Sequence, residues 1–319
     1  MQSWLLRRLL SLIPTLFLVT VIVFIVIRLV PGNIIDLMVS QHEYSMEGSG
    51  GREQIRSALG LDRPLYAQYG IWLKDIVLKG DLGKSLWTRM DVSAQIGARI
   101  QTTLELGIIA IVFALILAIP IGVYSAIRQD TIGDYVGRTI AILGLAIPNF
   151  WLGTMVIVFP SLWWNWSPPV QLIKFTEDPW GNLGMFILPG VVLGLSMAST
   201  TMRMMRTMML EVLRQDYIKT AWAKGLRERV VNMRHAMKNA LIPVVTLIGL
   251  QLPILIGGTV IIEQIFGLPG MGLLMLEAIT QRDYPIITGV NLVIGMGVLV
   301  INLLVDMSYS ILDPRVQYK

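Results

Sequence analysis

The sequence predicts an all-α protein that crosses a membrane several times. The chain has 319 residues, of which 54% are apolar and only 15% are charged, and its mean hydropathy is +0.65. Soluble domains carry about 25% charged residues, so this chain has too few ionic groups to cover a soluble surface. Long apolar stretches and an uneven distribution of lysine and arginine support the same interpretation. We therefore expect a multi-pass protein of the cell membrane.

Six apolar stretches are long enough to cross the hydrocarbon core, which takes about 20 residues of α-helix. They are residues 9–27, about 102–127, 139–163, 183–202, 239–266 and 285–312. The first resembles a signal peptide, but no Ala-x-Ala cleavage site follows it, since the first alanine is Ala58. We interpret it as a retained anchor. Prolines inside several stretches are compatible with membrane helices, whose neighbours satisfy the freed backbone groups.

Lysine and arginine gather on one side of the predicted membrane. Fifteen of them lie in the N-terminal tail, the second and fourth connections and the C-terminal tail, whereas the third and fifth connections hold only Lys174 and Arg282. By the positive-inside rule, both termini are cytoplasmic. The chain then divides into an N-terminal tail with the first helix (1–30), an extracytoplasmic loop subdomain (31–101), a five-helix core (102–312) that includes a cytoplasmic loop (203–238), and a cytoplasmic C-terminal tail (313–319).

Composition excludes several kinds of chemistry. Cysteine is absent, which removes disulfides, thiol nucleophiles, iron–sulfur clusters and Cys-zinc sites. The two histidines, His42 and His235, are too far apart in sequence to suggest a local metal-ligand pair. The net charge of +5 marks the cytoplasmic side of a membrane protein rather than nucleic-acid binding. Residues 80–85 (GDLGKS) lack the first glycine of a phosphate-binding loop, because Leu78 stands at that position in a predicted outside loop.

Three carboxylates fall within the predicted spans: Glu105, Glu263 and Asp306. An ionisable group inside a membrane is a functional hypothesis by default. We favour a structural pairing for each of them, because the spans contain no series of acids and histidines that would form a proton relay. The spacing of Gly190 and Gly194 permits two helices to pack closely.

The fourth connection carries the most informative pattern. Between residues 211 and 230, apolar residues at four-residue steps form one broad stripe on a helix, and basic residues occupy much of the remaining surface. The stripe consists of Leu213, Tyr217, Ile218, Ala221, Trp222, Leu226 and Val230. Gly225 interrupts the helix and marks a bend. Such a helix either lies on the membrane with its cations toward anionic lipid or docks into a groove on a cytoplasmic partner, and the pattern leaves both open.

The same connection resembles the cytoplasmic loop of peptide-type ABC transporter permeases, in residues 215–226 (QDYIKTAWAKGL) and 234–243 (RHAMKNALIP). The resemblance extends along almost the whole chain. Its other parts are residues 7–14 (RRLLSLIP), 28–32 (RLVPG), 59–64 (LGLDRP), 80–85 (GDLGKS), 147–153 (IPNFWLG), 266–272 (FGLPGMG), 282–285 (RDYP), 302–306 (NLLVD) and 312–315 (LDPR). Their order is similar to that in the first of the two permeases of a dipeptide or oligopeptide importer.

This resemblance implies the type I ABC importer permease fold, with six transmembrane helices in the inner or plasma membrane of a prokaryotic cell. It implies that the chain forms half of a pore for peptides or similar small solutes. The implied partners are a second permease, two ATPase subunits that bind ATP and Mg²⁺, and an extracytoplasmic substrate-binding protein. The chain itself is then a pore subunit in contact with membrane lipid, without catalytic, cofactor or metal sites of its own.

The resemblance also implies that the loop helix docks on an ATPase subunit. The residues that match the family's loop are Asp216, Tyr217, Lys219, Thr220, Ala221, Gly225 and Leu226. Lys219, Thr220 and Ala221 stand where ABC importers generally carry Glu-Ala-Ala, so no role of that glutamate can be transferred to this chain.

The polar residues Asn149, Ser196 and Gln251 are candidates for the translocation pathway, although polar contacts between helices are the favoured interpretation of each. Two other classes of function were weighed. An ion-coupled secondary transporter, the alternative function, would show internal repeats and ionisable groups in its spans. A membrane-embedded enzyme would need a paired nucleophile and base or a metal cluster. The sequence shows none of these features clearly.

The topology can be tested by cysteine labelling, because the chain has no cysteine of its own. We expect Ser3→Cys and Gln317→Cys to resist a membrane-impermeant thiol reagent applied to intact cells, and to react once the cells are permeabilised. Labelling of either position from outside would contradict the cytoplasmic placement of that terminus.

Overall fold

The computed structural model describes residues 2–29, 62–169 and 171–312. Regular secondary structure in this part of the chain is helical, and the pairing of Lys84 with Asp91 is an isolated β-bridge. The C-terminal tail at 313–319 and much of the predicted extracytoplasmic subdomain, residues 31–61, lie outside the described residues.

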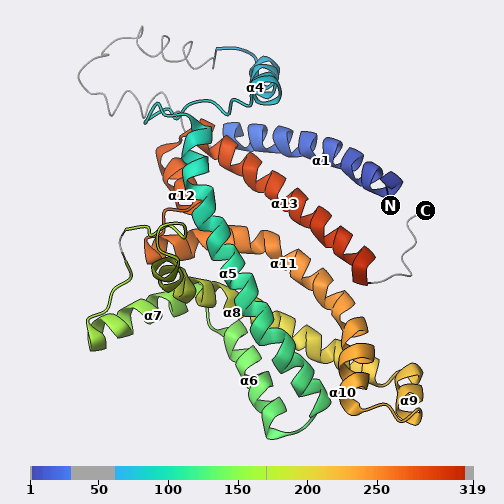
Figure 1. Ribbon diagram of the computed structural model, residues 1–319. Helices are drawn as coiled ribbons and strands as arrows, with labels where there is room; N and C mark the ends of the chain where they lie inside the picture. The colour runs from blue at the N-terminus through green and yellow to red at the C-terminus, as the bar shows by residue number, and fades with distance from the viewer. Residues whose placement is uncertain (1, 30–61, 170, 313–319) are drawn as a thin grey trace. The chain divides into compact units, whose positions relative to one another are not determined.

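The helices follow one another along the chain as labelled in Figure 1. They are α1 (Gln2–Leu29), α4 (Leu65–Lys79), α5 (Val92–Ile127), α6 (Ile132–Ala146), α7 (Asn149–Trp164), α8 (Pro179–Leu213), α9 (Asp216–Ala223), α10 (Glu228–Val230), the π-helix η1 (Val231–Ala236), α11 (Met237–Phe266), α12 (Met271–Gln281) and α13 (Tyr284–Leu312). Four stretches, Val92–Ile127, Pro179–Leu213, Glu228–Pro253 and Tyr284–Met307, are long and apolar enough to cross a membrane. The number rises to six if two bent helix pairs each count as one span, and the apolar segment Leu10–Val26 of α1 is shorter.

The predicted span 139–163 is wrong as a single helix. The chain forms α6 and α7 instead, and the two helices make an angle of 97°. Pro148 has no N–H group, and its ring disfavours a helical conformation at the residue before it. Ile147 is accordingly extended, with φ −86° and ψ 120°. The proline that the sequence placed inside a span is therefore the point at which the helix breaks.

The chain forms two compact units, which we describe separately. Of the described residues, 99–169, 171–273 and 297–312 form one unit, and 2–29, 62–98 and 274–296 form the other. Within the first unit, α8 contributes a buried row that includes Phe186, Leu193 and Met197, and this row packs with α5 residues such as Leu106. Partly buried side chains of α7 cover the same core.

Close approach of α8 to α5 depends on the pair Gly190 and Gly194. A Cβ atom at Gly194 would overlap the backbone carbonyl group of Ala110, and one at Gly190 would overlap the side chain of Ile109. The prediction that Gly190 and Gly194 permit close helix packing is therefore confirmed, because the two helix backbones meet there without side chains between them.

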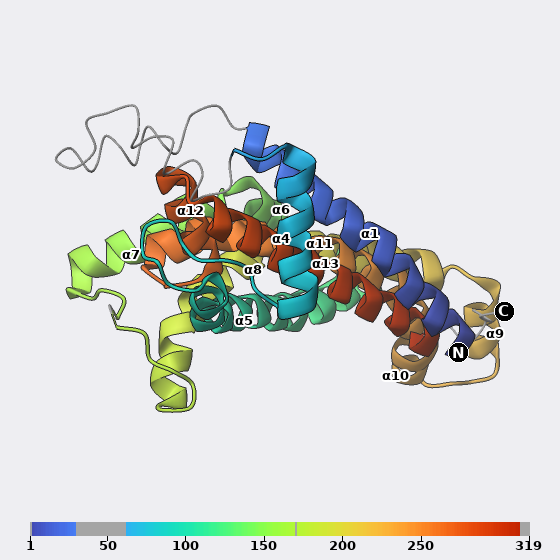
Figure 2. The same cartoon turned by 90° about the horizontal axis from the view of Figure 1, so that it is seen from above.

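In the other unit, α1 and α4 cross and contact each other through aromatic side chains (Figure 2). Phe24 packs edge-on against Tyr69, with ring centroids 5.2 Å apart, and lies 5.6 Å from Trp72. The hydroxyl groups of Thr20 and Tyr69 are 2.9 Å apart and share a hydrogen bond. This polar contact fixes the register of two otherwise apolar surfaces.

Gly194→Ala tests the close contact of α8 with α5. We expect it to destabilise the protein by about 1–3 kcal/mol through overpacking, although alanine favours helix over glycine by about 1 kcal/mol. Gly184→Ala is the matched control on the same helix, because an added Cβ there meets no atom within 4 Å. The midpoint of thermal unfolding in detergent should fall for Gly194→Ala and stay level or rise for Gly184→Ala. Equal midpoints would contradict the packing.

Candidate functional site

The strongest candidate site is the basic loop between α8 and α11, which contains the short helices α9 and α10 (Figure 1). α8 ends at Leu213, and α9 begins after the turn residues Arg214 and Gln215. This eight-residue helix carries five of the seven residues that the sequence assigned to a docking loop.

The centre of the predicted apolar stripe faces the chain's own core. Ile218 is fully buried, and Ala221 is only 7% exposed. Both belong to a cluster with Met205 and Met209 of α8, which also includes residues of α5 and α11. These two residues of the stripe therefore pack within the chain, where their apolar surface is already removed from water.

The opposite side of α9 is polar and is flanked by aromatic rings. Asp216, Lys219 and Thr220 are exposed, whereas Tyr217 and Trp222 are 44% and 45% exposed. Lys219 Nζ lies 2.7 Å from Asp216 Oδ1, and the hydrogen bond and charge of this ammonium group lower the pKa of Asp216. The pair is open to water, so it contributes little to stability. The Tyr217 hydroxyl accepts a hydrogen bond of 2.7 Å from the Asn239 side chain.

Gly225 ends α9 in a left-handed turn. Its φ is +75°, and its N–H donates to the carbonyl of Trp222 at 2.9 Å. The N–H of Leu226 donates to the carbonyl of Ala221 at 3.4 Å. These two bonds form a Schellman motif, in which the position after the C-cap favours glycine. An added Cβ meets no atom within 4 Å, so the requirement for glycine in this chain comes from the backbone angle and not from space.

The segment that follows α9 is also attached to the helical core. Val231 and Ala236 are fully buried in the same cluster as Ile218. The guanidinium group of Arg128, at the end of α5, lies 4.0 Å from the carboxylate of Glu228 in α10. The loop therefore continues the helical body of this unit, and the side chains that α9 exposes are held in defined positions.

The three pathway candidates are not joined to one another by hydrogen bonds in the described part of the chain. Asn149 is the first residue of α7, and Ser196 lies within α8. The Gln251 side chain of α11 donates weakly to the hydroxyl of Thr201, at 3.4 Å. Thr201 is fully buried, so for Gln251 the geometry is that of a polar contact between helices.

Glu263 is fully buried at the break between α11 and α12. Its Oε1 accepts a hydrogen bond of 2.7 Å from the hydroxyl of Thr103, and its Oε2 accepts one of 2.8 Å from the amide of Leu273. Thr103 in turn accepts from the amide of Met271 at 2.8 Å. The structural pairing expected for Glu263 is therefore present, with hydroxyl and amide donors.

Glu105 makes a second pairing of the same kind. Its two carboxylate oxygens accept from the side-chain amides of Gln101, at 2.7 Å, and Asn182, at 3.1 Å. Asn182 is buried and also donates to the carbonyl of Ile173 at 2.8 Å. Asp306 lies half-buried on α13.

Asp134 and Arg206 form a buried ion pair that the sequence analysis missed. Arg206 on α8 donates from Nε and from one terminal nitrogen to the two oxygens of Asp134 on α6, each at 2.8 Å. Asp134 is fully buried and also accepts from the amide of Asp130 at 3.1 Å. Asp134 and Arg206 both lie just outside the predicted apolar spans, so the search for charges within spans did not include them. The sequence feature that could have indicated the pair is an aspartate in the first turn of a helix after a connection.

The segment that resembled a phosphate loop is used for internal packing. Ser85 is buried, and its hydroxyl donates to the carboxylate of Asp283, which also accepts from the amide of Leu86 at 3.2 Å. The amide of Gly83 donates to Asp81 at 2.8 Å. These groups are satisfied within the chain, which explains the Gly-Lys-Ser sequence without a nucleotide.

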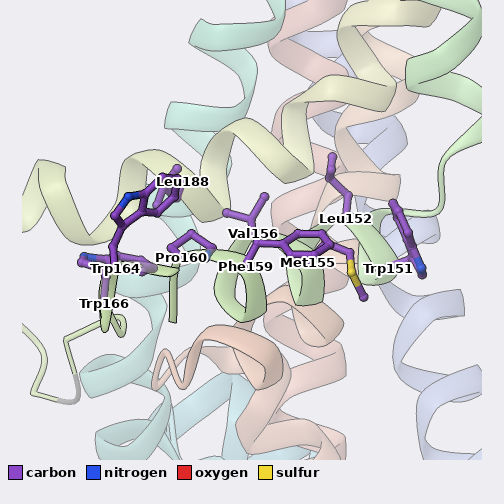
Figure 3. A pocket seen from close by; sticks show the side chains of 9 residues that line it. All are labelled: Trp151, Leu152, Met155, Val156, Phe159, Pro160, Trp164, Trp166 and Leu188. Carbon is purple, nitrogen blue, oxygen red and sulfur yellow. The ribbon is translucent and has the colours of Figure 1, made fainter. Parts of the chain in front are cut away.

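α7 borders an apolar groove of about 510 Å³. Figure 3 shows its lining: Trp151, Leu152, Met155, Val156, Phe159, Pro160, Trp164, Trp166 and Leu188. Tryptophans near the end of a membrane helix are typical of the boundary between hydrocarbon and water. The groove can receive apolar chains, and its polar groups are too few to orient a polar ligand.

Residues 118–318 match the family described as binding-protein-dependent transport system inner membrane component, and residues 1–107 match the N-terminal family of the same membrane components. The dipeptide transport system permease protein DppB of Escherichia coli (strain K12) is 37% identical over 342 residues, and that of Alkalihalophilus pseudofirmus is 39% identical over 338. The glutathione transport system permease protein GsiC of Pectobacterium atrosepticum is 37% identical over 319. Each alignment covers all of both chains.

A solved structure of the MetNI methionine ABC transporter in an inward-facing conformation is similar in fold. The TM-score is 0.56 with 17% sequence identity, over 69% of this chain and 97% of that one. At this identity the likeness concerns the fold alone.

The left-handed conformation of Gly225 predicts a graded response to substitution. Gly225→Asn should preserve the turn, because asparagine tolerates this conformation, whereas Gly225→Val should disrupt it, because a β-branched residue does not. Partial unfolding of α9 would expose the bonds after Lys224 and Arg227, so we expect faster tryptic cleavage there in Gly225→Val only. Equal cleavage in both variants would contradict the role of the backbone angle.

Proposed function

Because the chain belongs to the family of binding-protein-dependent transport system inner membrane components, and is thus a pore-forming permease subunit of an ATP-driven importer, we propose that α9 receives the movement of a cytoplasmic ATPase subunit and passes it to the pore. The fold agrees with the expected type I importer permease. The family assignment replaces the alternative of an ion-coupled secondary transporter. Transport across the membrane, rather than catalysis by this chain, is its activity.

One observation carries this proposal: α9 is buried on one side and open on the other. Ile218 and Ala221 attach it to the core formed by α5, α8 and α11. Asp216, Lys219, Thr220 and the edges of Tyr217 and Trp222 remain accessible. A helix attached in this way transmits displacement, because a close-packed core resists local deformation. Among the seven predicted docking residues, we propose that Ala221 and Gly225 hold α9 in position, whereas the others contact the ATPase subunit.

The remaining features of the assembly are parts of the same proposal. Two ATPase subunits bind ATP and Mg²⁺, a second permease completes the pore, and an extracytoplasmic protein delivers the ligand. Both termini are cytoplasmic, as the distribution of basic residues supports. Dipeptides and glutathione, named for the relatives, are short peptides, and we propose ligands of that class. Asn149 and Ser196 stay as pathway candidates, whereas the contact with Thr201 favours a structural role for Gln251.

Placing a charge beside α9 should uncouple ATP hydrolysis from transport. Leu226 is 37% exposed next to the end of α9, so Leu226→Glu leaves the chain's own core largely intact while placing a charge in the proposed interface. A desolvated, unpaired interface charge costs about 2 kcal/mol or more, which corresponds to a loss of about thirtyfold or more in ATPase binding or ligand-stimulated turnover. Both are measured by co-purification of the ATPase subunits and by ATP hydrolysis in proteoliposomes.

Tyr66→Glu is the matched control, because Tyr66 is more exposed than Leu226 and lies on α4, in the segment predicted to be outside the cell. It should leave coupling unchanged. Lys219→Ala should also have a small effect, since an exposed ion pair contributes little. Normal turnover in Leu226→Glu, with normal membrane insertion, would reject docking through α9 while leaving the family assignment in place.

A further inference from the structure

A basic pocket lies between α6 and α8, away from α9. It has a volume of about 340 Å³ and is lined by Arg138, Ile142, Arg203, Arg206 and Thr207. Arg138 and Ile142 are one turn apart on α6, and Arg203 and Thr207 are one turn apart on α8, so two matching helix faces form its walls. The volume falls within the range of about 300–1,000 Å³ that is usual for small-ligand sites.

The pocket has more positive charge than its own carboxylate neutralises. Asp134 takes a two-point hydrogen bond from Arg206, and Arg138 lies farther from it, at 3.9 Å. In the part of the chain that the structure describes, no carboxylate forms an ion pair with Arg203. Asp130 also acts on Arg206 electrostatically, so three guanidinium groups and two carboxylates still leave a net charge of +1 around the pocket.

Arg206 is held in place before any ligand binds. Its guanidinium group is only 20% exposed and is fixed by the buried Asp134, so little side-chain freedom remains to be lost on binding. Arg138 is partly oriented by the ring of Tyr135, whose centroid lies 5.5 Å from the guanidinium carbon. Planar, oriented guanidinium groups are well suited to bind phosphate through paired hydrogen bonds.

Apolar side chains beside the arginines indicate the source of the phosphate. Ile142 lines the pocket and is 61% exposed, and Leu143 next to it is also exposed. Residues 140–146 of α6 and 183–195 of α8 are entirely apolar, and hydroxyl residues then appear in α8 before Arg203, so the arginines lie where both helices leave the apolar region. A ligand in the pocket therefore meets the guanidinium groups on one side and apolar side chains on the other. Basic pockets between membrane helices bind anionic lipid headgroups by this arrangement.

We propose that this pocket binds the phosphate of an anionic glycerophospholipid, with Arg138, Arg203 and Arg206 as the phosphate ligands and Ile142 against the start of an acyl chain. The bound lipid would neutralise the excess charge and hold α6 against α8. None of the residues that line this pocket belongs to α9.

The test uses the full-length chain, purified with the subunits that it retains, and native mass spectrometry with added phosphatidylglycerol or phosphatidylcholine. We expect phosphatidylglycerol to bind at least about tenfold more tightly than phosphatidylcholine, and Arg203→Gln or Arg138→Gln to reduce that preference by about tenfold. Arg214→Gln is the matched control, because it removes the same charge from the end of α8 outside the pocket. Arg206→Gln is avoided, since it would leave Asp134 buried without its partner.

Four outcomes would overturn the proposal. The first is equal binding of the two lipids, and the second is an equal loss of binding in Arg214→Gln and Arg203→Gln. The third is displacement of phosphatidylglycerol by millimolar inorganic phosphate, which would identify a site for soluble anions instead. If Arg203→Gln retained full lipid preference but lost the second permease on purification, the pocket would be a protein interface and the lipid assignment would be rejected.

Discussion

The hydrogen bonds of the Glu263 side chain hold the break between α11 and α12, where the backbone leaves its helix in an apolar part of the chain. The first amides of α12 have no partners in their own helix, and hydrocarbon offers no water to satisfy them. Glu263 accepts directly from Leu273 and, through Thr103, is linked to the amide of Met271. Each unsatisfied buried donor would cost about 1–3 kcal/mol, so the break requires these partners.

The other carboxylates follow the same constraint. Asp178 accepts from the amides of Trp180 and Gly181 at the start of α8, and Asp134 accepts from Asp130 and Arg206 near the start of α6. Negative charge is favourable near the N-terminus of a helix because the backbone dipoles point there. A chain with few acidic residues thus uses several of them to end or begin helices, and this use explains why acids near the spans need not form a proton relay.

Periodicity and resemblance predicted the helical class, the apolar helices, the close pair Gly190 and Gly194 and the loop that contains α9. They could not predict that Pro148 breaks a span, because proline is also tolerated within membrane helices. They also could not predict which side of the stripe is buried, since Ile218 and Trp222 have similar apolar character, but Ile218 is fully buried and Trp222 is 45% exposed. Partners far apart in sequence, such as Asp134 with Arg206, depend on tertiary contacts that no local pattern records.

Methionine forms much of the surface on which α9 lies. Met205 and Met209 are fully buried against the cluster of Ile218 and Ala221, and Met204 and Met208 pack at its edge. An unbranched thioether side chain can adopt several rotamers of similar energy, so methionine keeps contact when neighbouring helices shift. A layer of leucine or valine would hold one arrangement more rigidly. If an ATPase subunit moves α9, as proposed, this layer allows the helix to stay attached to the permease, because it combines continuous burial with adaptable packing.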